Sequence, residues 1–211
     1  QRTEKALEIK RPQTPVKPYP YHDEDVSYDN KDAAITIAGT LTMPKTGGPF
    51  PAALLITGSG PQDRNESLLG HQPFFVLADY LTRQGIAVLR VDDRGVGKST
   101  GHFATATTRD FANDVLAGIA YLKTRKEIDP GQIGLVGHSE GGIIGPMVAA
   151  QSTDVAFVVM MAGTGLKGED ILYLQGDLIG MAAKGATKEA VAKNHALQKR
   201  LFDAGQDREI N

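Results

Sequence analysis

Buried-strand and helix patterns alternate through the middle of the chain. Runs of mostly apolar residues, typical of strands buried on both faces, occur at 52–56, 86–91, 133–136 and 155–161. Apolar residues at helical spacing lie between and after these runs, at 74–81, 111–122 and 143–150. Because strands that alternate with helices form parallel sheets through right-handed crossovers, the pattern predicts an α/β fold in which helices cover both faces of a mostly parallel sheet.

Two of these helices carry recognisable end signals. Pro73 stands where the first turn of a helix tolerates proline, and Gly85 is expected to end the same helix. Thr107 precedes the next helix, and Asp110 follows it at the spacing of a capping box.

The two ends of the chain differ from this core. Residues 1–24 are charged and rich in proline, which predicts an extended linker or arm. Residues 25–165 are expected to form the core, which starts with antiparallel strands where apolar positions alternate at 26–28 and 34–43. Residues 166–211 contain two amphipathic helices with no strand between them. Such an insertion predicts a helical cap over the carboxyl end of the sheet, and the alternative is that the helices cover a sheet edge.

A serine stands in a tight turn between a buried strand and a helix. The residues are Gly137-His138-Ser139-Glu140-Gly141. The glycines of such a nucleophile elbow are needed because a side chain there would collide with the neighbouring strand or helix. Ser139 is therefore predicted to be a nucleophile, and the Glu140 N–H, at the start of a helix, to form half of an oxyanion hole. The alternative is an ordinary turn rich in Gly and Ser.

The loop after the first parallel strand is the expected source of the second oxyanion donor. It has the sequence Gly58-Ser59-Gly60-Pro61. Pro61 has no N–H, so the possible donors are Ser59 and Gly60. The alternative is a plain turn at the end of the strand.

Three polar residues that follow this loop have more than one possible role. Asp63 and Arg64 either pair with each other, which would rigidify the loop, or contact the substrate. His71, just before the first helix, either lines the pocket or serves as a capping and packing residue.

The segment 92–99 contains Gly97-Lys98-Ser99, the end of a phosphate-binding loop motif. A true motif requires a glycine five positions before Gly97, and that position is Asp92. An acidic side chain there would repel phosphate, so nucleotide binding is not predicted. We expect instead a loop in which Asp92 and Arg94 form an ion pair.

Composition and charge exclude several classes of partner and binding site. The chain has 211 residues, a formal net charge of −2 and no basic block, which argues against nucleic acid or an anionic membrane as partner. No apolar run approaches the ~18 residues of a membrane span. The chain contains no cysteine, which excludes disulfides and thiolate metal sites, and neither a cofactor nor a metal is expected. Its first residue is Gln rather than Met, which predicts a longer precursor.

Together the three motifs resemble those of the α/β-hydrolase superfamily, in particular its bacterial esterase and serine-aminopeptidase-like branch. They lie at 58–64, 92–99 and 137–142. The resemblance covers about residues 25–165. It implies that Ser139 attacks a small-molecule carboxylic ester, or less often an amide, to form an acyl-enzyme that water hydrolyses. It favours Ser59 over Gly60 as the donor, and it implies a periplasmic or secreted protein, with a cytoplasmic one as the alternative.

The superfamily places the catalytic acid and histidine after the serine, in that order. The sequence after Ser139 has one histidine, His195, on a helix face predicted to be solvated, which makes it a weak candidate for the base. The acid, the histidine and the last strands are therefore expected beyond residue 211, in a remainder that docks on the apolar edge strand at 155–161. Residues 1–211 alone are expected to be nearly inactive. A noncatalytic binding protein that keeps the elbow as scaffold is the alternative.

Overall fold

The computed structural model describes residues 11–183, 185 and 187–209, and the side chains of these residues up to 204. The first ten residues of the predicted linker lie outside the described residues. The chain divides into two compact units, one up to Gly163 and the other from Thr164. The strands of the first unit are β1 (His22–Asn30), β2 (Ile35–Met43), β3 (Phe50–Ile56), β4 (Ala87–Val91), β5 (Ile128–His138) and β6 (Phe157–Met161). Its helices are α1 (Pro73–Arg83), α2 (Thr108–Thr124) and α3 (Gly141–Ala149).

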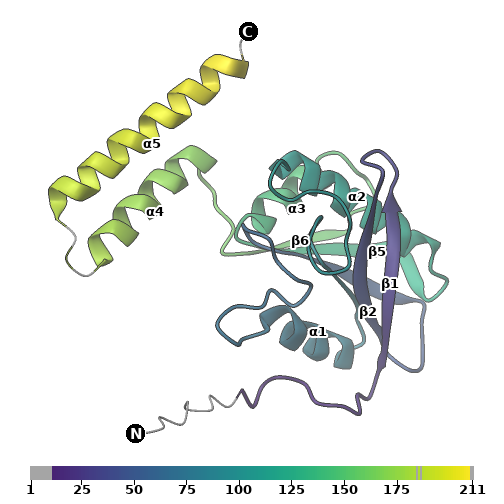
Figure 1. The fold of residues 1–211 in the computed structure, drawn as a ribbon. Helices are drawn as coiled ribbons and strands as arrows, with labels where there is room; N and C mark the ends of the chain where they lie inside the picture. Colours follow the sequence, from purple (N-terminus) through teal and green to yellow (C-terminus); the bar gives the residue numbers. More distant parts are fainter. Residues whose placement is uncertain (1–10, 184, 186, 210–211) are drawn as a thin grey trace, which may run out of the picture. The chain divides into compact units, whose positions relative to one another are not determined.

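These strands form one sheet in the order β1-β2-β4-β3-β5-β6 (Figure 1). β4, β3, β5 and β6 are parallel to one another, and β2 and β1 extend the sheet in antiparallel fashion. The predicted α/β fold with a mostly parallel sheet is confirmed.

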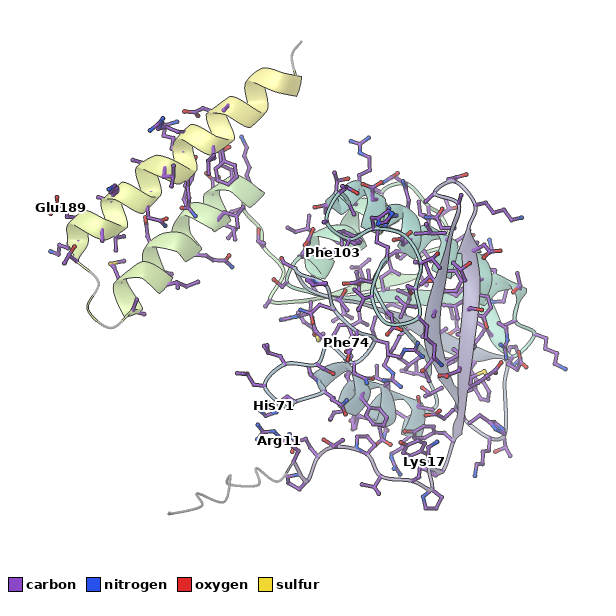
Figure 2. All side chains as sticks on the ribbon, viewed as in Figure 1. Arg11, Lys17, His71, Phe74, Phe103 and Glu189 are labelled. Carbon is purple, nitrogen blue, oxygen red and sulfur yellow. The ribbon has the colours of Figure 1, made fainter. Side chains whose placement is uncertain are left out.

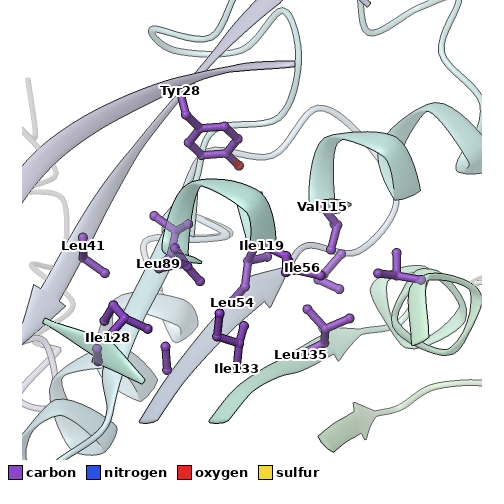
Figure 3. Packing of buried hydrophobic residues seen from close by; sticks show 14 of the residues in the cluster. Tyr28, Leu41, Leu54, Ile56, Leu89, Val115, Ile119, Ile128, Ile133 and Leu135 are labelled. Atoms are coloured by element: carbon purple, nitrogen blue, oxygen red, sulfur yellow. The ribbon is translucent and has the colours of Figure 1, made fainter. Parts of the chain in front are cut away.

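Helices cover both faces of the sheet because successive side chains of the central strands point to opposite faces. On one face, Leu55 of β3 packs with Phe74 of α1, which is 1% exposed (Figure 2). On the other face, Leu54 packs in a larger cluster with Val115 and Ile119 of α2 (Figure 3). The apolar run of β3 therefore reflects burial on both sides, as the sequence predicts.

The predicted helix ends are confirmed. α1 begins at Pro73, and Gly85 follows it with a φ of +94°. At the start of α2, Thr107 and Asp110 form a reciprocal capping box. The start of β1 differs from the expected domain boundary: His22, inside the segment predicted as linker, pairs with Met43 and extends the β1–β2 ladder.

β6 is the last strand of the sheet in the described part of the chain and pairs with β5 alone. Three of its side chains are large, apolar and exposed: Phe157 (39%), Val159 (45%) and Met160 (48%). The sequence prediction of an apolar edge strand is thus confirmed for the described residues.

The second unit is a pair of helices, α4 (Gly168–Ala182) and α5 (Lys188–Glu209). The Gln198 amide of α5 lies against Gly176 of α4, where a built Cβ would be 2.7 Å from Gln198 Oε1. His195 of α5 stacks on Tyr173 of α4, with ring centroids 4.9 Å apart. The predicted role of this unit as a cap over Ser139 stays a prediction. None of the helices in the described ranges has the length and apolar character needed to cross a bilayer.

Candidate active site

Ser139 lies at the end of β5 in a strained backbone conformation. Its φ is +52°, in the left-handed region that residues other than glycine rarely adopt. The turn is held by a hydrogen bond from the Ser139 N–H to the Met161 carbonyl, at 2.9 Å. A Cβ on Gly137 would overlap the Gly141 carbonyl, and one on Gly141 would overlap the Ile56 carbonyl. The two glycines are therefore required by this turn for the reason inferred from the sequence, and strain of this kind is common at nucleophiles.

Glu140 stands at the N-cap position of α3. Backbone N–H groups at a helix start have no acceptor within the helix and can stabilise a negative charge. The Glu140 side chain accepts a hydrogen bond from Thr108 Oγ1 at 2.8 Å, which ties the start of α3 to the start of α2. This arrangement suits the predicted oxyanion role of the Glu140 N–H, which stays a prediction.

The loop after β3 lies directly beside the elbow. A Cβ built on Gly58 would be 3.2 Å from Ser139 Cβ and 3.2 Å from His138 Nδ1. Two segments that are far apart in the sequence are thus brought together at the carboxyl ends of β3 and β5. Ser59 and Gly60 follow Gly58 in this loop, and Gly60 has a φ of +97°. Their role as oxyanion donors stays a prediction.

A cavity of about 40 Å³ adjoins both segments. Gly58 and Gly60 of the loop and Glu140 of the elbow line it, and Phe103 and Phe111 contribute aromatic walls. A volume of this size holds one or two water molecules or a small group of a substrate.

The ion pairs around this site differ from the expected one. Asp92 does not pair with Arg94: Arg64 Nη2 lies 2.7 Å from Asp92 Oδ2, and Arg94 Nε lies 2.7 Å from Asp114 Oδ2. Burial acts to raise the pKa of Asp92, but hydrogen bonds from Arg64 and from the Lys98 N–H outweigh it and leave the pKa below its ordinary value. Asp92 therefore anchors the loop that carries Arg64.

The three polar residues with open roles all lie outside the 40 Å³ cavity. Asp63 Oδ1 accepts the N–H groups of Asn65 and Ser67, so it shapes its own turn and does not pair with Arg64. Arg64 is bound to Asp92 and, at 3.1 Å, to Asp25. His71 is exposed on the loop that leads into α1, where it lines a surface groove along that helix (Figure 2).

Sequence reasoning gave no role to Glu66, which is buried, or to Asp93, which is partly buried. Glu66 Oε1 lies 2.8 Å from the Gly58 nitrogen and 2.7 Å from His138 Nδ1. Asp93 accepts hydrogen bonds from Thr57 Oγ1 at 2.7 Å and from the Gln62 N–H at 2.9 Å. Both residues lie in polar loops without periodicity, so no local pattern marks their carboxylates as shielded from water.

Asp93 makes the stability of the protein depend on pH. Burial raises the pKa of Asp93 to about 6, against hydrogen bonds from Thr57 and Gln62 that act to lower it. The folded state thus binds the proton more tightly than the unfolded chain, where the ordinary pKa is 3.8. The contribution of Asp93 to stability is therefore fully present below pH 3.8 and is lost as the pH rises through 6.

Asp93→Asn is expected to remove this loss, because an amide can keep both hydrogen bonds without a charge. The free energy of unfolding of the variant, relative to wild type, should rise by up to about 3 kcal/mol between pH 4 and pH 7.5. Urea unfolding at several pH values measures it. Asp32→Asn, on an exposed side chain, is the control and should show no such trend. The prediction would be contradicted if the free energy of unfolding changed with pH in the same way in wild type and in Asp93→Asn.

His195 is held within the helical unit, where its Nδ1 lies 3.0 Å from Asp177 Oδ2. Within the described ranges, His, Cys, Asp and Glu side chains form no group of three or more that could hold a metal ion.

Comparison with known proteins identifies the family. A family model described as serine aminopeptidase, S33, matches residues 72–202, more than half of the chain and including the elbow. The chain belongs to this family. It is an esterase-like member of the α/β-hydrolase superfamily, as the motifs suggested.

The chain is similar to esterase EstD of Thermotoga maritima, with 31% identity over 162 residues. The matched region is 74% of this chain but 39% of EstD, so the chain spans well under half the length of this relative. Among solved structures, the α/β hydrolase GrgF from Penicillium sp. matches with a TM-score of 0.58 and 23% identity, over 76% of this chain and 54% of that chain. The esterase Pf2001 of Pyrococcus furiosus matches with a TM-score of 0.62 and 19% identity, over 82% of this chain and 60% of that chain. At such identities the structural likeness shows the fold alone.

Proposed function

We propose that the protein hydrolyses carboxylic esters of small molecules through an acyl-enzyme on Ser139. The observation that carries the proposal is the position of Ser139: it occupies a left-handed turn between β5 and α3, directly beside Gly58 of the loop after β3. This proximity of Ser139 to the loop after β3 supports the proposal, because that loop and the start of α3 are the proposed sources of the two oxyanion donors. The relation to esterase EstD supports the choice of ester substrates.

In the proposed reaction Ser139 Oγ attacks the ester carbonyl carbon while its proton passes to a base. The carbonyl oxygen becomes an oxyanion that accepts hydrogen bonds from the N–H groups of Glu140 and Ser59, with Gly60 as the second choice for the loop donor. The intermediate collapses, the C–O bond to the alcohol breaks, and the alcohol leaves with the proton. Water then attacks the acyl-enzyme in the same way and releases the carboxylic acid.

We propose that the base and its orienting acid come from sequence that follows residue 211. The order serine, acid, histidine of the superfamily supports this, as does the small share of EstD that the chain covers. The exposed apolar edge of β6 supports the docking of that sequence on the sheet, because proteins usually pair or cover such an edge. His195 is the alternative base: Asp177 engages its Nδ1, as the acid of a triad would, but the His195 side chain is 43% exposed on a helix face rather than held in an enclosed site.

Amide hydrolysis is a second candidate function, favoured by the description of the family as serine aminopeptidases. Ester and amide substrates use the same nucleophile and oxyanion hole, so the shape of the substrate pocket decides between them.

Covalent labelling tests the proposed function. A fluorophosphonate probe is expected to label the full-length protein at Ser139 with a stoichiometry near one, and the Ser139→Ala variant is expected to remain unlabelled. Mass spectrometry of the labelled peptide identifies the site. Turnover of p-nitrophenyl acetate and of an aminoacyl p-nitroanilide by the same preparation separates esterase from aminopeptidase activity. Labelling that persists unchanged in Ser139→Ala would exclude Ser139 as the nucleophile.

A further inference from the structure

Glu66 links the two halves of the proposed oxyanion hole. One carboxylate oxygen, Oε1, accepts the Gly58 N–H at 2.8 Å and lies 2.7 Å from His138 Nδ1. Gly58 immediately precedes the proposed loop donor Ser59, and His138 immediately precedes the nucleophile Ser139. Glu66 is 7% exposed, so water competes little for this carboxylate.

The backbone around Glu66 is fixed in an unfavourable conformation. Glu66 has a φ of +52°, in the left-handed region, and its N–H donates to the Asp63 carbonyl at 2.9 Å. A glutamate in this region costs free energy that surrounding contacts must offset. Strain held at a residue that joins two parts of a reaction centre points to a positioning role.

The two residues before Glu66 hold the same loop from other directions. Arg64 binds Asp92 at the end of β4. The Asn65 side chain accepts a hydrogen bond from buried Arg90 of β4, and its carbonyl accepts the Phe74 N–H at 3.1 Å. Three consecutive residues thus fix the loop to β4, α1 and the elbow, and Glu66 makes the contact with the elbow.

The hydrogen bond to Glu66 restricts the direction of the Ser59 N–H. The hydrogen bond fixes the peptide plane that contains the Gly58 N–H. The Ser59 N–H belongs to the following peptide plane, so its direction depends only on the φ and ψ angles of Gly58. An oxyanion donor contributes fully only when it is aimed in advance at the position where the charge develops. Without Glu66, the Gly58 N–H would lose this acceptor at a residue whose backbone is the least restricted of all.

We propose that Glu66 is the positioning residue that fixes the oxyanion loop to the nucleophile elbow. The inference rests on the proposed function and assigns Glu66 a part in it. Glu66 acts through Gly58 and His138 rather than through the substrate, and its effect falls on the transition state rather than on substrate binding.

The test compares Glu66→Ala, Glu66→Gln and Glu66→Asp in the full-length protein, with Glu127→Ala at the surface as control. Glu66→Ala is expected to lower kcat for p-nitrophenyl acetate by about 10- to 100-fold and to change KM by less than about threefold, because the donor is misplaced but not removed. Glu66→Gln should stay within about threefold of wild type, since the Gln Oε1 can accept both hydrogen bonds. The Asp side chain is too short to reach both partners, so Glu66→Asp should lower kcat as much as Glu66→Ala does. Should Glu66→Ala fail to fold, Glu66→Asp provides the same test.

Amide hydrogen exchange at Gly58 gives a readout that does not depend on activity. The Gly58 N–H should exchange at least about tenfold faster in Glu66→Ala or Glu66→Asp than in wild type, and at a nearly unchanged rate in Glu66→Gln. If the wild-type protein neither hydrolyses the ester nor takes the fluorophosphonate, the proposed function fails and hydrogen exchange alone decides whether Glu66 holds the loop. If wild type is active but Glu66→Ala matches Glu127→Ala in kcat and in exchange at Gly58, the positioning role is wrong and the function stands.

Discussion

Ser139→Ala is expected to lower kcat for ester hydrolysis by the full-length protein by a factor of about 10⁵–10⁶. Loss of the serine nucleophile in a comparable catalytic triad has an effect of this order, because the remaining oxyanion hole and binding groups supply only a small part of the acceleration. The structure gives Ser139 no evident packing role that would confound the result: its distinctive features are its left-handed φ and its proximity to Gly58.

Steady-state kinetics on p-nitrophenyl acetate measures the effect, with active-site titration of wild type to count competent enzyme. The unfolding free energy of Ser139→Ala should stay within about 0.5 kcal/mol of wild type, since alanine occupies the same backbone conformation at similar cost. A variant that keeps more than a tenth of the wild-type kcat would show that hydrolysis proceeds from another group.

Arg94→Met is expected to lower the free energy of unfolding by about 3–5 kcal/mol, the largest change in stability that we predict. Arg94 and Asp114 are each 8% exposed and form two hydrogen bonds, from Nε at 2.7 Å and from Nη2 at 2.9 Å. Without the guanidinium, the buried Asp114 carboxylate would keep Asn30 Nδ2 as a partner, but it would lose its compensating charge.

Denaturant unfolding of the same preparation measures the loss, with Lys123→Met as the matched control. Lys123 pairs with Asp154 at 2.6 Å, but both side chains are well exposed, so breaking that pair should change stability by less than about 1 kcal/mol. Adding Asp114→Leu to Arg94→Met should recover part of the loss, because no uncompensated charge then remains buried. An Arg94→Met variant within about 1 kcal/mol of wild type would show that the buried pair is compensated elsewhere.

The Arg94–Asp114 ion pair, which is expected to stabilise the fold, also borders the cavity beside the proposed active site. Arg94 and Asp114 line the 40 Å³ cavity together with Asp93, Gly58 and Glu140. Substitutions in this network are therefore expected to affect both folding and the geometry of the elbow, and each kinetic effect should be corrected for the folded fraction.

The sequence by itself determined most of the helices and strands and the tight turn at Ser139. The alternation of buried runs and helical spacing reproduced the parallel part of the sheet, and the box formed by Thr107 and Asp110 marked the start of α2. The Gly-x-Ser-x-Gly turn was readable because its requirement is local: a chain that reverses so tightly leaves no room for a Cβ on Gly137 or Gly141. Patterns of this kind depend on periodicity and backbone sterics, which residues a few positions apart express directly.

Only the tertiary structure decided which charged side chains meet. Asp92 and Arg94 are two positions apart, and sequence reasoning paired them, yet their side chains find Arg64 and Asp114 on different elements. Glu66 gave no local signal, although it contacts His138, 72 positions away. Strand order and crossovers bring these residues together, and each buried charge then takes the partner that can satisfy it in the space available.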